Sequence, residues 1–365
     1  MNNVLNQATL DAIAQAYTYD LPKIQRVRDV RLKPKTFFRD NLFGGAPAAS
    51  NDEMSTIEFR RGDTRVATDS MLFSDATIGP ARDEHDIKII RYAYFNNKEQ
   101  VGPKDANKLF FGEDPLHPYT RQQRLGLALA EKRDKIIDAY AMAEEKMCFD
   151  ALFTGTVESR NGGRQVFPLL NTMINFTVAK AWNTNTIKRK DVESDIVRAA
   201  SLIYDNSGIV PTRLLVSFKD SMLPFYTSDA TYVGTTIEAQ RMLSNGQLQQ
   251  ETGTRHVGTI QTEFGPLEII TYLGKYVDAS GNTHSLIPDG KAILCGPDPI
   301  GYMAYGPGLV VTANGQDLQS VHNLATVYNT VKDGYMQDIG VVVQNAPMAV
   351  IDNLDSYVVI GGIDG

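Results

Sequence analysis

Cysteine and long apolar runs are scarce in this chain, and each shortage excludes a class of protein. Only two cysteines, Cys148 and Cys295, occur among 365 residues, and they stand too far apart to form a CxxC metal or redox motif. Cysteines do not normally pair in a reducing compartment, so we expect both to be buried as small hydrophobic residues. No apolar run approaches the roughly 18 residues that a membrane-spanning helix needs.

An excess of positive charge is also missing. The 36 Lys and Arg residues are outnumbered by 43 Asp and Glu residues, which gives a formal net charge of −7. This balance argues against a protein whose whole surface binds nucleic acid, and it leaves a local basic patch as an open alternative. The opening residues Met1–Val4 lack the charged and apolar regions of a signal peptide, so we expect the chain to be made and used in a cytoplasm.

The motifs of common catalytic and nucleotide-binding sites are missing as well. The glycines of 253–258 and 296–301 have the spacing of a phosphate-binding loop, but neither pair is followed by Lys and Ser or Thr. There is no GxGxxG after a strand, no GxSxG elbow and no HExxH. The five histidines form no i,i+4 pair, and no general acid and base can be selected among the carboxylates. We therefore expect no enzyme activity, no cofactor and no metal site.

Two short matches carry little weight. Asp83-Glu84-His85-Asp86 combines the residue types of metal ligands, but alternate residues of a strand face opposite sides. A solvated charged turn is the favoured interpretation of this motif. Arg61-Gly62-Asp63 spells an adhesion tripeptide, and we interpret a three-residue match in an expected loop as chance.

What the chain does contain is a succession of segments of different character. Residues 20–40 hold seven Lys or Arg against three Asp, a net charge of +4, which predicts an extended basic arm. An amphipathic helix is predicted before the arm at 10–17, and a hinge composition follows it at 44–51. The arm could contact nucleic acid or an acidic partner, or form an exposed strand edge, because alternating charge fits each of these.

A polar, strand-like excursion comes next. The sequences TIEFR and DIKIIRYAYF predict two strands, and the stretch between them has few large apolar residues. A two-stranded ribbon is marginally stable in isolation. We therefore expect this ribbon to lie against another subunit or surface.

The strongest helical signal lies between Tyr119 and Thr154. Its large apolar residues recur at steps of 4, 7, 4, 3 and 4 from Leu125 to Met147. A helix over this range is ~54 Å long at 1.5 Å per residue. Its apolar stripe needs a long sheet or several neighbours to cover it.

The remaining segments predict short helices and hairpins. A turn signal at 160–164, followed by VFPLLNTMINFTV, predicts strands. Helices are predicted at about 190–206, 221–227 and 236–243, and the last third of the chain predicts mostly strand. The mixture indicates an α+β fold and not repeated βαβ units.

Six short motifs stand in a particular order from Phe37 to near the end of the chain. They are Phe37-Phe38-Arg39-Asp40, Glu144-Glu145 with Ala151-Leu152 and Gly155, Ser217-Phe218-Lys219-Asp220, Gly274-Lys275-Tyr276-Val277-Asp278, Ile287-Pro288-Asp289 and Val343-Gln344-Asn345-Ala346-Pro347-Met348. In these motifs and their order the chain resembles the major capsid protein of tailed bacteriophages, and within that group the bacteriophage lambda capsid protein E family.

The resemblance implies the Hong Kong 97 fold and a division of the chain. The implied parts are an N-terminal arm (1–50), an E-loop (51–92), a peripheral domain (93–190) with its spine helix (119–154), an axial domain (191–315) and a return to the peripheral domain (316–365). The implied function is that of a major capsid (head) protein. Such a protein self-assembles into hexamers and pentamers of an icosahedral shell around double-stranded DNA. It is assembled in the host cytoplasm and resides in the virion capsid.

Two other interpretations stay open at this point. An encapsulin-like nanocompartment shell shares the fold, and the lambda-like C-terminal residues argue against it. A soluble cytoplasmic enzyme of unknown class is the second, and the missing catalytic constellation argues against that.

The resemblance also implies partners and contact residues. The partners are other copies of the chain, a scaffold protein, a portal, a decoration protein and the packaged DNA, with no membrane. About fifty residues precede the E-loop, so the scaffold is expected to be a separate protein. The candidate inter-subunit or partner contacts are Arg26, Arg28, Arg31, Lys33, Arg60, Arg61 and Arg65.

Covalent cross-linking between subunits is not expected. In cross-linking relatives a Lys on the E-loop attacks an Asn of a neighbouring subunit. Here no Lys occurs between Lys35 and Lys88, and Arg is no substitute because its guanidinium stays protonated. Neither cysteine falls in the E-loop, so disulfides cannot replace the missing bond.

Overall fold

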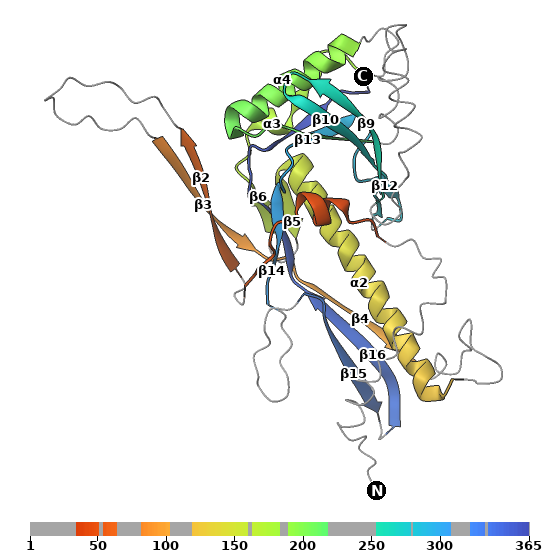
Figure 1. Cartoon of the computed structure of the whole chain (residues 1–365). Coiled ribbons are helices and arrows are strands. Elements are labelled where there is room, and N and C mark those ends of the chain that lie inside the picture. Colours follow the sequence, from red (N-terminus) through yellow and green to blue (C-terminus); the bar gives the residue numbers. More distant parts are fainter. Residues whose placement is uncertain are drawn as a thin grey trace, which may run out of the picture.

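The computed structural model of this chain describes residues 34–50, 54–63, 82–102, 119–159, 163–182, 189–217, 253–278, 280–307, 322–332 and 335–364. Within these ranges it combines one long helix, shorter helices, several sheets and a ribbon that projects from the body (Figure 1). Helices and strands are thus mixed, as predicted for the α+β class. The helices predicted at 10–17, 221–227 and 236–243 lie outside the described residues.

Helix α2 (Arg121–Thr154) forms where the sequence predicts a helix at 119–154 (Figure 1, yellow). A capping box fixes its N-terminus: the Thr120 hydroxyl accepts from the Gln123 backbone N–H, and the Gln123 side chain accepts from the Thr120 backbone N–H. The helix ends at Gly155, whose left-handed backbone (φ 64°) disfavours any residue with a side chain.

A three-stranded sheet covers the N-terminal half of α2 at the lower end of Figure 1. Its strands, in spatial order, are β15 (Leu324–Lys332), β16 (Tyr335–Asn345) and β4 (Phe95–Val101). Ile136 and Tyr140 of the helix are buried against Val343 of β16, and the Tyr140 hydroxyl donates to the Val343 carbonyl at 2.7 Å. This sheet is the cover that the apolar stripe of the helix was predicted to need.

A six-stranded sheet forms the upper part of the molecule in Figure 1. Its strands, in spatial order, are β7 (Phe176–Thr177), β18 (Tyr357–Gly361), β13 (Lys291–Cys295), β8 (Arg213–Ser217), β10 (Gly265–Tyr272) and β9 (Thr254–Thr262). Helix α4 (Arg189–Ser207), predicted at 190–206, buries Ile196 and Ile203 against this sheet. A small hairpin of β11 (Lys275–Val277) and β12 (Thr283–Ser285) follows β10 in sequence.

Residues 34–50, which we call the N-terminal segment, cross the centre of the molecule (Figure 1). A single π-helical turn, η2 (Phe38–Leu42), packs on α2, and β1 (Ala48–Ala49) adds to a sheet with β14 (Gly301–Tyr305) and β17 (Pro347–Ile351). The Ile300 backbone N–H donates to the Leu42 carbonyl at 2.7 Å. Phe38 and Leu42 are fully buried, so this segment belongs to the central core.

Three local predictions are wrong, and one of them is the loop expected at Arg61-Gly62-Asp63, which lies in a strand paired with residues 82–84. The expected hairpin forms as β5 (Thr156–Ser159) and β6 (Gly163–Val166), but the next segment contains the short helix α3 (Asn171–Ile174) where strand was predicted. Pro168, which has no backbone N–H, interrupts the strand pattern there. The motif at 83–86 lies in strand β3 (Arg82–Arg91) and not in a turn, because the ladder with β2 (Met54–Asp63) continues past it.

The prediction for the cysteines is confirmed. Cys148 and Cys295 are both free and fully buried. Burial in apolar surroundings raises the pKa of Cys148 well above its ordinary value and that of Cys295 to about 12, so both thiols stay protonated and unreactive. Among the described residues no helix is long and apolar enough to cross a membrane.

Candidate assembly surface and polar joint

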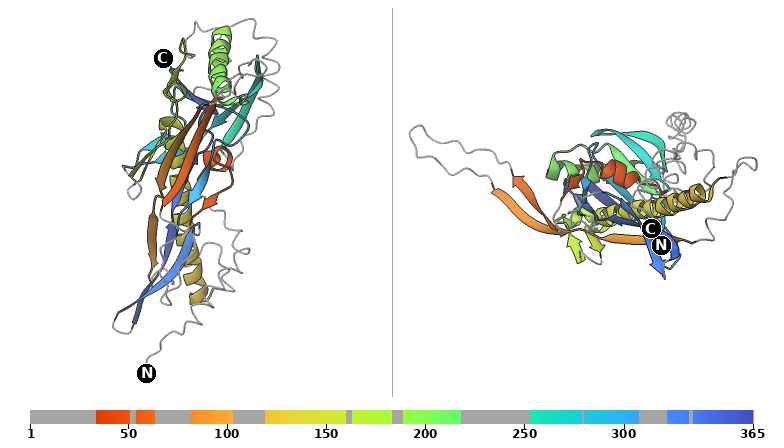
Figure 2. Two further views of the ribbon diagram at one scale, coloured as in Figure 1. Left: turned by 90° about the vertical axis from the view of Figure 1, so that its left-hand side faces the viewer. Right: turned by 90° about the horizontal axis from the view of Figure 1, so that it is seen from below.

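The antiparallel ribbon of β2 and β3 extends away from the rest of the chain (Figure 2). Its side chains alternate between two faces, as the period of a strand requires. On the inner face Phe59 and Ile90 are buried, and the Phe59 ring meets the Phe167 ring edge-on at 6.4 Å. The base of the ribbon is therefore held by the central core.

The outer face of the ribbon is uncovered within the chain. The residues of this face that the structure describes pair across the ladder as Met54 with Arg91, Thr56 with Ile89 and Glu58 with Ile87. All six are exposed. Ile87, Ile89 and Met54 have exposed fractions of 63%, 60% and 42%, and we call these three residues the ribbon stripe. Large apolar side chains aligned on one exposed face are typical of an interaction surface.

The arginine and lysine residues predicted as contacts fall in two groups. Arg60 and Arg61 lie in β2, opposite His85 and Glu84, and only their backbone is described. The other five, Arg26, Arg28, Arg31, Lys33 and Arg65, lie outside the described residues. The structure therefore does not test these seven contacts.

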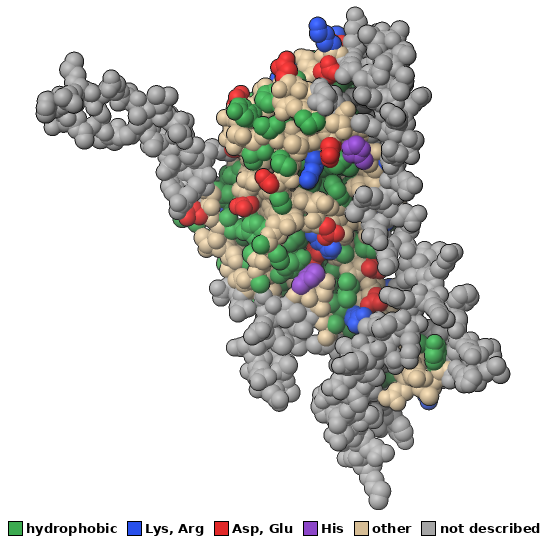
Figure 3. Space-filling view, in the orientation of Figure 1, with side chains coloured by type: hydrophobic (Ala, Val, Ile, Leu, Met, Phe, Trp, Pro, Cys, Tyr) green, Lys and Arg blue, Asp and Glu red, His purple; other side chains and the backbone are tan. Residues whose placement is uncertain are grey.

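Charged side chains show no concentration of one sign on the face in Figure 3. Acidic and basic residues are interspersed there among hydrophobic and neutral ones, as far as the coloured residues go. No group of three or more His, Cys, Asp or Glu residues in the described part of the chain could hold a metal ion. Of the two glycines with the spacing of a phosphate loop, Gly296 lies in the connection after β13 and Gly301 is the first residue of strand β14.

The second feature is a polar cluster buried between α2 and the N-terminal segment, which we call the polar joint. Its members are Glu144 and Glu145 of α2, Arg39 of η2, Tyr272 of β10, Asn345 of β16 and His322 just before β15. Both glutamates are fully buried. Four elements, together with the exposed His322 just before β15, thus meet at two adjacent carboxyl groups.

Glu145 binds the start of η2. Its two carboxyl oxygens accept from the backbone N–H groups of Phe38 at 2.8 Å and Arg39 at 2.9 Å, so it caps this helical turn from another element. The Tyr272 hydroxyl oxygen lies 2.6 Å from Glu145 Oε1. Burial raises the pKa of Glu145 to about 7, and the hydrogen bonds from the Phe38 and Arg39 backbone N–H groups limit this rise. Burial also raises the pKa of Tyr272.

Glu144 faces a different set of partners. Its Oε2 forms an ion pair with Arg39 Nη1 at 3.1 Å, and its Oε1 accepts from Asn345 Nδ2 at 2.6 Å and contacts His322 Nε2 at 3.2 Å. Arg39 also binds Asp40 through its Nε at 2.8 Å. The guanidinium therefore connects a buried and an exposed carboxylate.

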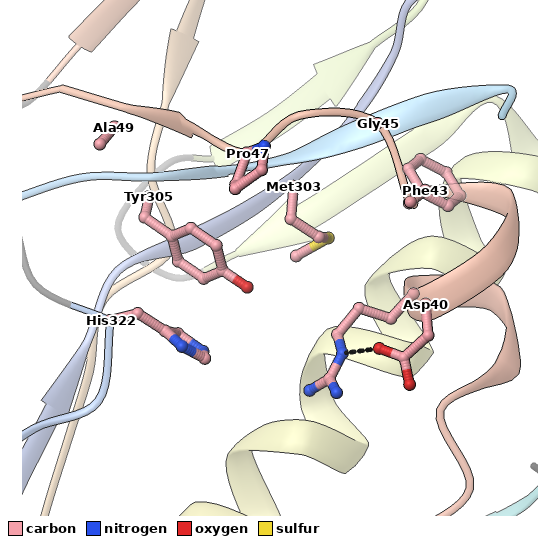
Figure 4. Close-up of a pocket in the computed structure, with 10 residues that line it drawn as sticks. Asp40, Phe43, Gly45, Pro47, Ala49, Met303, Tyr305 and His322 are labelled. Atoms are coloured by element: carbon pink, nitrogen blue, oxygen red, sulfur yellow. Dashed lines mark hydrogen bonds and ion pairs between the residues drawn. The ribbon is translucent and has the colours of Figure 1, made fainter.

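A groove of about 510 Å³ lies beside the joint (Figure 4). In the close-up, Phe43, Pro47 and Met303 line it with apolar surface, and Tyr305 and His322 face it from the other side. The rings of Tyr305 and His322 are 4.4 Å apart. Burial raises the pKa of Tyr305 above its ordinary value. Because Arg39 also lines the groove, the joint adjoins an opening to solvent.

The sequence predicts no site at Glu144 and Glu145, which occur there only as part of a family motif. A usable signal was present, since the apolar stripe of the helix includes Tyr140 and Met147, and a carboxylate four residues after Tyr140 must face the same side. A charged residue on a buried stripe is rarely left unpaired. The partners themselves could not be derived, because they come from elements up to 201 positions away.

The projecting ribbon thus carries an apolar stripe that the described part of the chain leaves uncovered. Comparison with known proteins identifies the family of the chain. The family model described as phage major capsid protein E matches residues 25–325. The chain therefore belongs to this family of phage major capsid proteins, and the predicted resemblance is confirmed.

The fold is shared with a solved structure. A prophage protein of Escherichia coli CFT073, assigned as a capsid protein, is 16% identical, with a TM-score of 0.57 over 96% of this chain and 98% of that chain. The capsid structure of cyanophage P-SCSP1u is more distant, with 9% identity and a TM-score of 0.48 over 93% of this chain and 91% of that chain. Among curated protein sequences there is no match. The predicted Hong Kong 97-type α+β capsid fold is confirmed as a fold.

Proposed function

We propose that this major capsid protein forms hexamers and pentamers that close into the icosahedral head of a tailed bacteriophage around double-stranded DNA. In this proposal the shell is assembled in the host cytoplasm and the chain acts structurally, without catalysis, cofactor or metal. The ribbon stripe carries the proposal, because it is a row of apolar side chains that the chain itself leaves uncovered. A closed shell needs heterologous contacts that curve back on themselves, and a projecting ribbon on each subunit supplies one such contact.

We propose that the chain is divided into the parts of a Hong Kong 97-type capsid subunit. The arm is 1–50, the E-loop is 51–92 with the ribbon as its described part, and the peripheral domain is 93–190 with α2 as its spine helix. The axial domain is 191–315, and 316–365 returns to the peripheral domain. The central core, in which the N-terminal segment packs with α2 and β14, supports treating the subunit as one body.

The proposed partners follow from the same role. They are a separate scaffold protein, a portal, a decoration protein where E-loops meet, and packaged DNA on the interior. The basic residues Arg26, Arg28, Arg31 and Lys33 are proposed to contact the scaffold or DNA, and Arg60, Arg61 and Arg65 to contact a neighbouring subunit. The net charge of +4 in residues 20–40 supports an acidic partner for the arm. Family membership does not favour the encapsulin-like shell or the enzyme.

The experiment that tests this function is assembly of the purified full chain with its scaffold, measured by sedimentation and electron microscopy. We expect closed particles or hexamer and pentamer precursors from the wild type. Replacing Ile87 and Ile89 by Thr keeps β-branched residues in the strand and removes about 1–2 kcal/mol per residue of apolar burial on assembly. The concentration needed for particles should then rise at least tenfold.

Val277→Thr is the matched control, because Val277 has an exposed fraction of 63% and lies on the β11–β12 hairpin and not on the ribbon. Its assembly should resemble that of the wild type. Monomers and dimers alone from the wild type would contradict the capsid function. Equal assembly by the Ile87 and Ile89 variant would remove only the role of the ribbon stripe.

The arm is tested in the same assay by replacing Arg26, Arg28, Arg31 and Lys33 with Gln. This variant should give fewer particles than the wild type. The difference should be larger at low salt than at high salt, since salt screens exposed charge contacts.

Subunits of the mature shell are proposed to be joined without covalent bonds. The tip of the E-loop has no Lys, since none occurs between Lys35 and Lys88, and both cysteines are fully buried in the subunit core. Boiled, unreduced particles on a denaturing gel should therefore give one band near 40.3 kDa. A ladder of dimers to hexamers would contradict this expectation.

A further inference from the structure

The hydrogen bonds around Glu145 do not balance if its carboxyl is ionised. The Tyr272 hydroxyl oxygen lies 2.9 Å from the Lys35 carbonyl oxygen and 2.6 Å from Glu145 Oε1. A phenol carries one proton and can donate it to only one of these two oxygens. The Phe37 N–H donates to the same hydroxyl at 3.4 Å. It therefore does not supply a hydrogen bond between the hydroxyl and either the Lys35 carbonyl or Glu145.

The arrangement balances when Glu145 carries a proton. Glu145 then donates to the Tyr272 oxygen, and Tyr272 donates to the Lys35 carbonyl. The Tyr272 oxygen uses its two lone pairs for Glu145 and the Phe37 N–H. The carboxyl group still accepts from Phe38 and Arg39 at 2.8 and 2.9 Å. The 2.6 Å separation is that of a short O–H···O hydrogen bond.

We propose that Glu145 holds a proton in the folded chain, shares it with Tyr272 in a hydrogen bond in which Glu145 is the donor, and loosens the attachment of η2 to α2 when it ionises. The proposal concerns the subunit itself and does not rest on the proposed function. It makes the polar joint a proton-responsive contact between the N-terminal segment and the long helix.

The neighbouring charges support a neutral Glu145. The titratable groups that face it are Glu144 and Cys148 on α2, Arg39 and Asp40 on η2, and Tyr272 on β10, with Tyr305 and His322 beyond Glu144. Arg39 is the one fixed cation in this described group, and its side-chain ion pairs go to Glu144 and Asp40. Only its backbone N–H reaches Glu145. Glu144 accepts hydrogen bonds from the Arg39 and Asn345 side chains, so the charge of Arg39 lies against Glu144 and not against Glu145.

The sign of the pH effect follows from linkage. Burial raises the pKa of Glu145 from 4.5 to about 7. The closed joint therefore holds a proton that an opened, solvated Glu145 would release. Closing is most favourable below about pH 4.5 and loses stability as pH rises through about 7. Between pH 6 and pH 8.5 the closing equilibrium should fall about tenfold.

Infrared spectroscopy of the full chain tests the proton directly. A protonated carboxylic acid absorbs infrared light at a different frequency from a carboxylate. At pH 6 exposed Asp and Glu side chains are ionised and do not contribute to the carboxylic acid band. We expect a carboxylic acid band at pH 6 that disappears by pH 8.5 and is absent from E145Q. Glu144→Gln is the matched control, with the same burial and the adjacent position, and it should keep the band. Absence of the band from the wild type, or its survival in E145Q, would overturn the proposal.

Tyr272→Phe tests the direction of the hydrogen bond. If Tyr272 accepts the proton of Glu145, its loss destabilises the protonated form, and the band should disappear at a lower pH than in the wild type. If Tyr272 instead donates to an ionised carboxylate, the band should persist to a higher pH, and the proposed donor would be wrong.

Amide hydrogen exchange tests the mechanical consequence. The protection factors of the Phe38 and Arg39 amides should fall about tenfold between pH 6 and pH 8.5 in the wild type and stay constant in E145Q. Protection that is independent of pH in the wild type would show that ionisation leaves the joint closed. Should E145Q fail to fold, the wild-type pH series and the Tyr272→Phe shift still decide the question.

Discussion

Gly301→Ala is expected to prevent the chain from accumulating as a folded protein. Gly301 begins β14, where the strand pairs with Ile351 of β17. A Cβ atom at this position would lie 2.0 Å from the Val350 carbonyl oxygen and 3.1 Å from the Ile351 Cα. Both obstacles are backbone atoms, so no side-chain rotation relieves the overlap. The strands must separate, and the cost should reach the exceptional range above about 4 kcal/mol.

The damage should spread because the N-terminal segment lies on the same strand end. Gly45 N–H donates to the Gly301 carbonyl at 3.2 Å, and the neighbouring Ile300 N–H donates to Leu42. Moving β14 away from β17 therefore also detaches the segment that connects η2 to β1. We expect insoluble protein, or soluble protein without a cooperative urea transition.

Gly361→Ala is the matched control. Gly361 also lies in a strand, β18, but its added Cβ would meet nothing nearer than the Phe176 carbonyl oxygen at 3.7 Å. This contact is ordinary, and the unfolded chain loses conformational freedom, so a neutral or slightly stabilising effect of up to about 1 kcal/mol is expected. Soluble, cooperatively folding Gly301→Ala protein would show that the strand end adapts more than its packing indicates.

The sequence predicted local elements well where period and end signals agree. The long helix was predicted at 119–154 and lies at Arg121–Thr154, because Thr120, Gln123 and Gly155 are cap residues and the apolar stripe is regular. The ribbon strands were predicted from their apolar and polar alternation, and the need for a neighbour was inferred from their composition. Ile87 and Ile89 are exposed on that ribbon.

Long-range partners could not be predicted in the same way. Nothing local in the sequence shows that Glu145 meets the backbone of Phe38, 107 positions earlier, or that Glu144 meets Asn345. In the sequence Gly301 stands out only by its spacing from Gly296. Its requirement for glycine comes from the close approach of the β17 backbone. These features depend on topology, and period and capping signals describe only local structure. The capsid family could be predicted without these partners, because the resemblance rests on six short motifs and on their order along the chain.

Arg39→Met is expected to destabilise the folded chain by about 3 kcal/mol. Met fills much of the volume of the arginine stem but leaves Glu144, which has an exposed fraction of 0%, without its cationic partner. Removing one member of a buried ion pair costs about 3–5 kcal/mol because the remaining charge is uncompensated. The lower end applies here, since the Arg39 side chain has an exposed fraction of 24% and Asn345 still donates to Glu144.

Arg164→Met provides the matched control, because Arg164 also faces a glutamate, Glu158, at 3.7 Å, but both side chains are mostly exposed. Exposed pairs contribute about 0–1 kcal/mol, so this variant should unfold at nearly the urea concentration of the wild type. The double variant Arg39→Met with Glu144→Gln should recover most of the loss, since the uncompensated charge is then gone. Urea unfolding of the four proteins measures these differences. If Arg39→Met is no more destabilising than Arg164→Met, the polar joint does not hold the N-terminal segment through charge, and packing of Phe38 and Leu42 must hold it instead.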